Sequence, residues 1–201
     1  MIFRTLTTFA LGLSLSLTAA SASAQSTWTA DPTHSEVGFS VKHLMVSNVK
    51  GQFKKYDVKV ALDEKDITKS TLDVTIEAGS IDTGLADRDA HLKSPEFFNV
   101  EKNPNLTFKS TKIAKAGKGG LKITGDLTMN GVTKSVVLNV EGPTSEIKDP
   151  WGNIKRGVSA TTTIKRTDFG LNWNKALEAG GVVVSEEVKI SLELELVKKA
   201  A

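Results

Sequence analysis

The feature that most constrains this chain is an alternation of apolar and polar residues with a period of two, which recurs from Glu36 almost to the C-terminus. Such alternation places every second side chain on one face of a strand, and it is typical of antiparallel sheets that bury one face. We count about eight such runs, a number consistent with a closed barrel or a sandwich. In the longest run the apolar residues occupy even positions: Val182, Val184, Val188, Ile190, Leu192, Leu194 and Leu196.

Short glycine-containing segments separate these runs. Asn130-Gly131 lies between two alternating runs and predicts a tight hairpin, because both turn positions need a positive φ. The segment 116–120 reads as another hairpin loop on the same grounds. Gly51, Gly79 and Gly125 stand singly among strand residues, and we interpret them as bulges or bends.

Only one stretch has the composition of a helix. Leu85–Lys93 contains no β-branched residue, and Asp82 or Thr83 is expected to cap its first turn. Pro95 disfavours a helical conformation in the residue before it, so the helix should end there. The sequence therefore predicts an all-β fold, an extended antiparallel eight-stranded barrel with a short helical crossover near residues 85–98.

The first 24 residues have the pattern of a cleaved signal peptide, with one positive charge at Arg4, an uncharged leucine-rich stretch and the small-x-small motif Ala22-Ser23-Ala24. Removing residues 1–24 leaves 201 − 24 = 177 residues, a length that suits a single domain from 25 to 201. We therefore expect an exported protein, located in the periplasm of a Gram-negative cell.

Composition excludes several classes of function. The chain has no cysteine, which excludes disulfides, thiol catalysis and thiolate metal sites. Without Arg4 there are 25 basic and 23 acidic side chains, a charge of 25 − 23 = +2. Because the two signs are interspersed, we expect no nucleic-acid partner.

The segment Asp87-Arg88-Asp89-Ala90-His91 concentrates charge on the predicted helix. On a helix Asp87 and His91 are i,i+4 neighbours, and Arg88 and His91 are i,i+3 neighbours. An Arg–His pair at a cavity rim could bind an anionic or carbonyl head group. The alternative is a local lattice of ion pairs that fixes the crossover to the barrel, and the residues alone favour this alternative because two acids flank the arginine.

The histidines do not form a convincing metal or catalytic set. His34 and His43 are nine residues apart, about 30 Å along an extended strand. His43 shares the parity of the inward-facing Phe39 and Val41, so we expect a core or rim histidine. No nucleophile elbow, phosphate loop or His-Glu-x-x-His motif occurs. We therefore predict no metal, no cofactor and no catalytic residue.

Aromatic residues gather in two parts of the sequence and could either plug one end of the barrel or form the wall of an apolar ligand site. Arg166 and Glu186 both have inward parity on their predicted strands, so either they pair or a bulge near 185–187 turns Glu186 outward. This cluster of five aromatic residues and one leucine comprises Phe97, Phe98, Phe108, Phe169, Leu171 and Trp173.

From about Trp28 to Val197 the chain resembles the YceI-like family of exported, lipocalin-like polyisoprenoid-binding proteins. Each motif is weak alone, but their order and spacing are specific. The motifs are Asp31-x-x-His34-Ser35-x-x-x-Phe39, His43 with Gly51-x-Phe53, Ser80-Ile81-Asp82-Thr83, Arg88-Asp89-x-His91-Leu92-Lys93-Ser94 with Phe97-Phe98, Phe108-x-Ser110, Gly125-x-Leu127, Gly131-Val132-Thr133, Arg166-x-Asp168-Phe169-Gly170 and Val184-Ser185.

This resemblance implies a barrel with a long hydrophobic tunnel for an isoprenoid chain, a homodimer, and a carrier rather than an enzyme. The ligand would be a quinone, a polyprenyl phosphate or another long-chain amphiphile, taken up through transient membrane contact. For the head group, the candidate residues are Arg88, His91 and Arg166. For the tail, the candidates are Phe39, Val41, His43, Phe53, Val60, Val74, Phe97, Phe98, Phe108, Phe169, Leu171 and Trp173.

Two alternatives remain open at this point. A stress-related structural or interaction protein would have a barrel filled by side chains. A lipid head-group enzyme would need His91 or His43 as a base.

Overall fold

The structure is a computed structural model that describes residues 25–178 and 180–200, so the predicted signal peptide lies outside the described residues. Within these ranges the only α-helix is α1 (Ala86–Lys93), and no described helix is long and apolar enough to cross a bilayer. The strands are β1 (Gln25–Ala30), β2 (Glu36–His43), β3 (Ser47–Phe53), β4 (Tyr56–Asp63), β5 (Thr71–Glu77), β6 (Ile81–Asp82), β7 (Asn105–Lys115), β8 (Leu121–Met129), β9 (Val132–Glu141), β10 (Ile147–Lys148), β11 (Ile154–Lys165) and β12 (Val184–Lys198).

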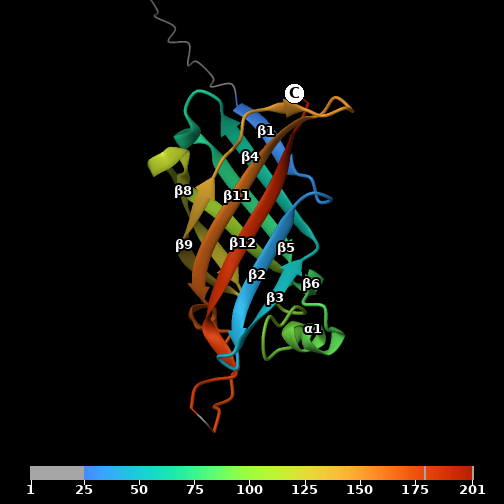
Figure 1. Cartoon of the computed structure of the whole chain (residues 1–201), viewed down its shortest axis with the longest axis vertical. Helices are drawn as coiled ribbons and strands as arrows, with labels where there is room; N and C mark the ends of the chain where they lie inside the picture. Colours follow the sequence, from blue (N-terminus) through green and yellow to red (C-terminus); the bar gives the residue numbers. More distant parts are fainter. Residues whose placement is uncertain (1–24, 179, 201) are drawn as a thin grey trace, which may run out of the picture.

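The strands close into an antiparallel barrel, which confirms the predicted fold class (Figure 1). The barrel order is β11-β9-β8-β7-β5-β4-β1-β12, and the pairing of β12 with β11 closes the circle. The long strand β12 has two partners on its other edge: β1 pairs near its C-terminal end, and β2 pairs along its first part. The hairpin β2–β3 therefore extends the lower part of the wall in Figure 1.

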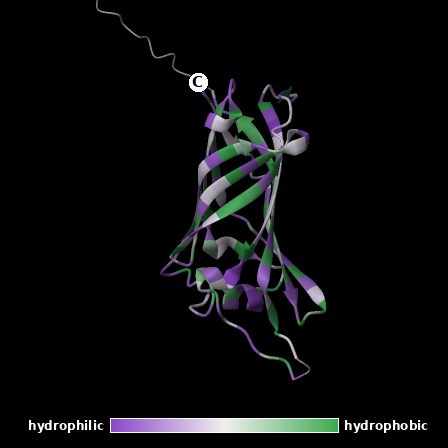
Figure 2. Cartoon of the chain, turned by 90° about the vertical axis from the view of Figure 1, so that its left-hand side faces the viewer, coloured by the Kyte–Doolittle hydropathy of each residue, from purple (hydrophilic) through white to green (hydrophobic). Residues whose placement is uncertain are grey.

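The predicted alternation places apolar side chains inside the barrel and polar ones outside, and Figure 2 shows it as alternating bands along the strands. Strand β9 is an example, because Leu138 and Val140 are buried whereas Val137, next to Leu138, is exposed. Buried residues form three contiguous apolar clusters along the interior. Burial of this one face supplies the main driving force for the fold.

Two predicted hairpin loops are present, and residues 116–120 form the one that joins β7 to β8. The isolated glycines differ from the prediction. Asn130 (φ 51°) and Gly131 (φ 76°) form the tight β8–β9 turn, as predicted. Gly51 is not a bulge, because it pairs directly with Phe39 in an uninterrupted β2–β3 register. Gly125 lies opposite a register shift between Ser110 and Lys112 of β7.

The helical crossover is present and ends at Lys93, before Ser94 and Pro95, as predicted. The predicted cap is wrong: Leu85 occupies the cap position and makes no side-chain cap bond. Asp82 instead accepts a bond from the Gly84 N–H (2.9 Å), so its carboxylate is used in the preceding turn. After the helix, the chain turns Phe97 and Phe98 into the main apolar cluster.

Candidate functional site

An apolar cavity of about 180 Å³ lies inside the lower and middle part of the barrel. Strands from all around the wall contribute to its lining, together with Leu92 of α1 and the two phenylalanines that follow. Every lining side chain is apolar except those of Thr162 and Arg166, and Gly38 contributes only backbone. Such a surface selects for hydrocarbon and offers polar contacts at very few points.

The structure brings most of the predicted tail contacts together on this cavity. They come from strands far apart in sequence, and their rings also contact one another: Phe53 lies 5.9 Å from both Phe39 and Phe98 between ring centroids. The predicted residues that line the cavity are Phe39, Val41, Phe53, Val74, Phe97, Phe98, Phe108 and Leu171.

A second apolar cavity of about 70 Å³ lies above the first, and Val60 lines this one instead. The interior is therefore divided into two cavities, whereas the family resemblance implied one continuous tunnel. Both cavities share wall residues, so these side chains form the constriction between them. The shared residues are Leu72, Leu138, Leu192 and Leu194.

Three other predicted contacts lie outside both cavity linings. Phe169 is buried in the main cluster, where its carbonyl accepts a bond from Asn130. Trp173 packs on the outside of the Phe97 ring, with centroids 5.3 Å apart. His43 is half-buried at the end of β2, beside the start of β12.

Arg88 and His91 are engaged by the crossover itself. Arg88 donates from Nε and Nη2 to the hydroxyl and the carbonyl of Thr83, at 2.7 and 2.8 Å. His91 Nε2 lies 2.7 Å from a carboxylate oxygen of Glu96, and its ring meets that of Trp173 edge-on. Neither side chain lines a cavity. In this geometry both fix the crossover to its surroundings.

Arg166 is the charged residue among those that line the main cavity, and it is only 4% exposed. Its guanidinium donates to the carbonyls of Ser185, Leu171 and Val184, which hold it at the end of the barrel where β12 begins. Burial lowers the pKa of Arg166, and the negative charge of Glu186 partly offsets this effect. Glu186 itself is exposed, because the β12 register shifts between Val184 and Val188. This is the predicted bulge.

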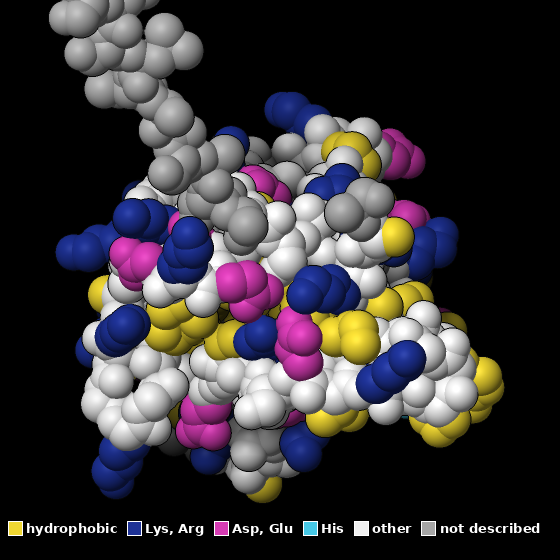
Figure 3. Space-filling view, turned by 90° about the horizontal axis from the view of Figure 1, so that it is seen from above, with side chains coloured by type: hydrophobic (Ala, Val, Ile, Leu, Met, Phe, Trp, Pro, Cys, Tyr) yellow, Lys and Arg dark blue, Asp and Glu magenta, His cyan; other side chains and the backbone are white. Residues whose placement is uncertain are grey.

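The upper end of the barrel is closed by Trp28, which sequence reasoning did not single out. Its side chain is completely buried, and its indole N–H donates to Ser26. Arg156 and Lys198 lie over the ring at 5.2 and 5.4 Å from its centroid. Figure 3 shows basic and acidic side chains interspersed over this end of the molecule.

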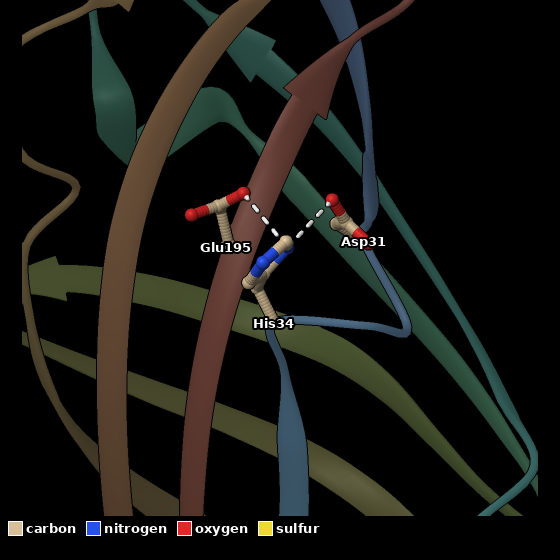
Figure 4. A group of neighbouring side chains, drawn as sticks. All are labelled: Asp31, His34 and Glu195. Atoms are coloured by element: carbon tan, nitrogen blue, oxygen red, sulfur yellow. Dashed lines mark hydrogen bonds and ion pairs between the residues drawn. The ribbon is translucent and has the colours of Figure 1, made fainter. Parts of the chain in front are cut away.

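Asp31, His34 and Glu195 form a polar cluster where the partner of β12 changes from β1 to β2 (Figure 4). Their ligand-type atoms lie within 4.8 Å of one another, a spacing that a metal ion could use. However, Lys155 Nζ is 2.6 Å from Glu195 and 3.4 Å from Asp31. The hydroxyl and backbone of Thr33 hold the pKa of Asp31 well below its usual range. The ammonium group already lies between these carboxylates and also contacts Asp149 (3.5 Å), so the geometry is accounted for as an ion-pair network.

Comparisons of this sequence with known proteins point to one family. The model of the YceI-like domain matches residues 28–196. A UPF0312 protein of Pseudomonas aeruginosa is 36% identical over 199 residues, which cover 99% of this chain and 100% of that protein.

Solved structures show the same fold. The YceI protein of Campylobacter jejuni superposes with a TM-score of 0.68 at 35% identity, covering 79% of this chain and 90% of that one. A domain from Saccharophagus degradans, described as a polyisoprenoid binding domain, has a TM-score of 0.63 at 16% identity, with 86% and 98% covered. Together with the motifs and the barrel, these matches show that the chain belongs to the YceI-like domain family.

Proposed function

We propose that this protein is an exported carrier that holds an isoprenoid-type lipid inside the barrel, with the tail in the main cavity and the polar head group at Arg166. The observation that carries this proposal is the 180 Å³ cavity, whose lining residues are apolar apart from Thr162 and Arg166. A family structure described as polyisoprenoid binding supports the same ligand class.

The tail would bind through burial of hydrocarbon alone. Each methylene transferred from water contributes about 0.8 kcal/mol, so several isoprene units bind well without polar contacts. The main cavity is comparable in size to an engineered cavity of about 150 Å³ that admits benzene, and it is smaller than sites for drug-sized ligands. A long prenyl chain therefore requires the leucines at the constriction to move aside and join the two cavities.

The head group would be anionic or strongly polar. A guanidinium has five N–H donors, and the three carbonyl bonds of Arg166 leave donors for a ligand oxygen. Among the described residues no carboxylate lies within ion-pair distance of Arg166, so an anion would be its direct counter-charge. A prenyl phosphate satisfies this requirement better than a prenyl alcohol whose chain has the same length.

The decisive experiment uses two valines that are neighbours on β9. Val136 lines the main cavity, whereas Val137 is 43% exposed on the outer face. We expect V136F to fill the cavity and to abolish the prenyl-lipid adduct seen by native mass spectrometry. V137F adds the same atoms outside and should retain the adduct.

Two results would reject the carrier proposal. One is a wild-type protein, purified from the exported fraction, that carries no lipid and takes up neither a prenyl phosphate nor a quinone. The other is equal lipid retention by V136F and V137F. In either case the barrel interior serves as a packed core, and the interaction-protein alternative becomes the better account.

Periplasmic location and a homodimer are further parts of this proposal. Osmotic-shock fractionation tests the first, and the protein should appear in the released fraction without residues 1–24. Light scattering of the purified protein tests the second.

A further inference from the structure

Exposed apolar side chains are concentrated at the end of the barrel where β2 joins β3. The tip of this hairpin is Leu44-Met45-Val46, and these residues are 41%, 49% and 84% exposed. Consecutive exposed apolar residues of this kind indicate a surface that meets an apolar partner. Leu85, which precedes α1 at the same end of the molecule, is also exposed (Figure 1).

The hairpin does not need these residues to turn. Leu44 and Met45 both have a positive φ, 50° and 59°, at the two central positions of a turn that the Val46 N–H closes by donating to the His43 carbonyl, and such positions favour asparagine and glycine. The same chain places Asn130-Gly131 at the two positive-φ positions of the hairpin between β8 and β9. Apolar side chains are therefore displayed at the tip despite an unfavourable backbone conformation, and local turn chemistry does not explain them.

The tip adjoins the end of the lipid cavity. The Leu44 N–H donates to the carbonyl of Val183 at 2.8 Å, and the next residue, Val184, lines the cavity together with Val41. The guanidinium of Arg166 is bonded to the carbonyl of Val184. A bilayer in contact with the tip would therefore lie beside the proposed head-group position.

The charged side chains of the hairpin itself are all basic. Between Ser40 and Gln52 it contains Lys42 and Lys50 and no acidic residue. Both lysines are exposed, and their long side chains can reach head groups while the tip enters the apolar layer. Glu186 and Glu187 are exposed on the neighbouring β12, so the apolar tip must provide most of the attraction.

We propose that Leu44-Met45-Val46 docks the protein on an anionic lipid bilayer, with the cavity end of the barrel facing the membrane. Docking is a property of the outer surface and does not depend on whether the cavity holds a lipid. Failure of vesicle binding and failure of lipid retention are therefore distinguishable.

The test compares two substitutions at equally exposed apolar residues. Val46 is 84% exposed at the tip, and Trp151 is 83% exposed in the turn before β11, at the opposite end of β12. Flotation with vesicles of equal parts phosphatidylethanolamine and phosphatidylglycerol measures the bound fraction. We expect V46D to lower the vesicle partition coefficient by at least about tenfold, because it removes an apolar contact and adds a negative charge. W151D should leave it unchanged.

A second measurement follows the tip directly. Because the chain has no cysteine, V46C and W151C each accept a single environment-sensitive dye. The dye at position 46 should shift to the blue on vesicles, and the dye at position 151 should not.

The docking proposal is overturned if the wild type does not bind these vesicles, or if W151D loses as much binding as V46D. It is also overturned if V46D binds vesicles normally but converts a dimer to a monomer in light scattering, because the tip would then be an interface between two copies.

Discussion

Gly51 shows how a single residue shapes the ligand site. A Cβ built on Gly51 would lie 2.4 Å from Cζ of Phe39, its direct cross-strand partner, and 2.9 Å from Cγ2 of Thr83. The Phe39 ring therefore occupies space that the side chain of any other residue at position 51 would fill. A Cβ on Gly125 would likewise lie 2.3 Å from Cζ of Phe108, although the direct partner of Gly125 is Ser110. These two glycines are structurally required by the aromatic wall.

Replacing Gly51 with alanine should therefore destabilise the protein by about 1–3 kcal/mol, the usual cost of overpacking. Urea denaturation of G51A measures the change in the free energy of unfolding. Gly79 is a matched control, because its nearest atom to an added Cβ is Glu77 Oε1 at 4.0 Å. G79A should change stability by no more than about 0.5 kcal/mol. Equal losses in the two variants would contradict this account of Gly51.

At the scale of elements, the crossover between β6 and β7 explains the charged segment around α1. Asp89 Oδ1 accepts bonds from both the N–H and the hydroxyl of Thr83, at 2.9 and 2.6 Å. Arg88 bonds the same threonine from its guanidinium. This network ties α1 to the chain leaving β6, and so it holds Phe97 and Phe98 against the cavity.

Substitution of Asp89 by alanine should cost about 1–3 kcal/mol of stability, because it leaves two half-buried donors of Thr83 without their acceptor. Hydrogen exchange should also show faster opening of α1 in D89A. Asp87 lies in the same first turn and is exposed, so D87A controls for the loss of a negative charge near the helix N-terminus. If D87A and D89A behave alike, the bonds to Thr83 do not anchor the crossover.

For the whole molecule, the division of the interior into two cavities should set the length of the lipid tail. Leu192 lines both cavities, whereas Leu106 lines only the main one. Trp28 closes the upper end, so a longer tail can be accommodated only through the leucine constriction.

Truncation of Leu192 to alanine should join the two cavities and lengthen the longest prenyl chain that the protein retains. L192A and L106A should both lose about 2–5 kcal/mol of stability, as is usual for truncations of large apolar residues inside a protein. Only L192A should shift retention toward longer prenyl phosphates in a native mass spectrometry series. Retention of the same chain lengths by both variants would show that the constriction does not limit the tail.

Periodicity could predict a large part of this fold, because alternation with a period of two reports directly which side chains share a face. It predicted the interior positions of β2, β4, β5 and the later strands, and Asn130-Gly131 predicted its hairpin. It did not predict β1, because a single buried tryptophan among short polar residues gives no alternating apolar pattern. Strand β3 was also not predicted, because Gly51 takes an apolar position in its pattern.

The sequence alone determined the fold class, the family and the strand faces, since these depend on local order along one chain. Only the tertiary structure decided the site. Parity places Arg166 inside, but the β12 bulge decides that Glu186 turns outward, so that Arg166 lines the cavity without this carboxylate beside it. Likewise, the alternation of apolar and polar residues does not give the volume of the space between opposite walls of the barrel. That volume depends on which side chains meet across the barrel, and here Leu72, Leu138, Leu192 and Leu194 meet to divide it.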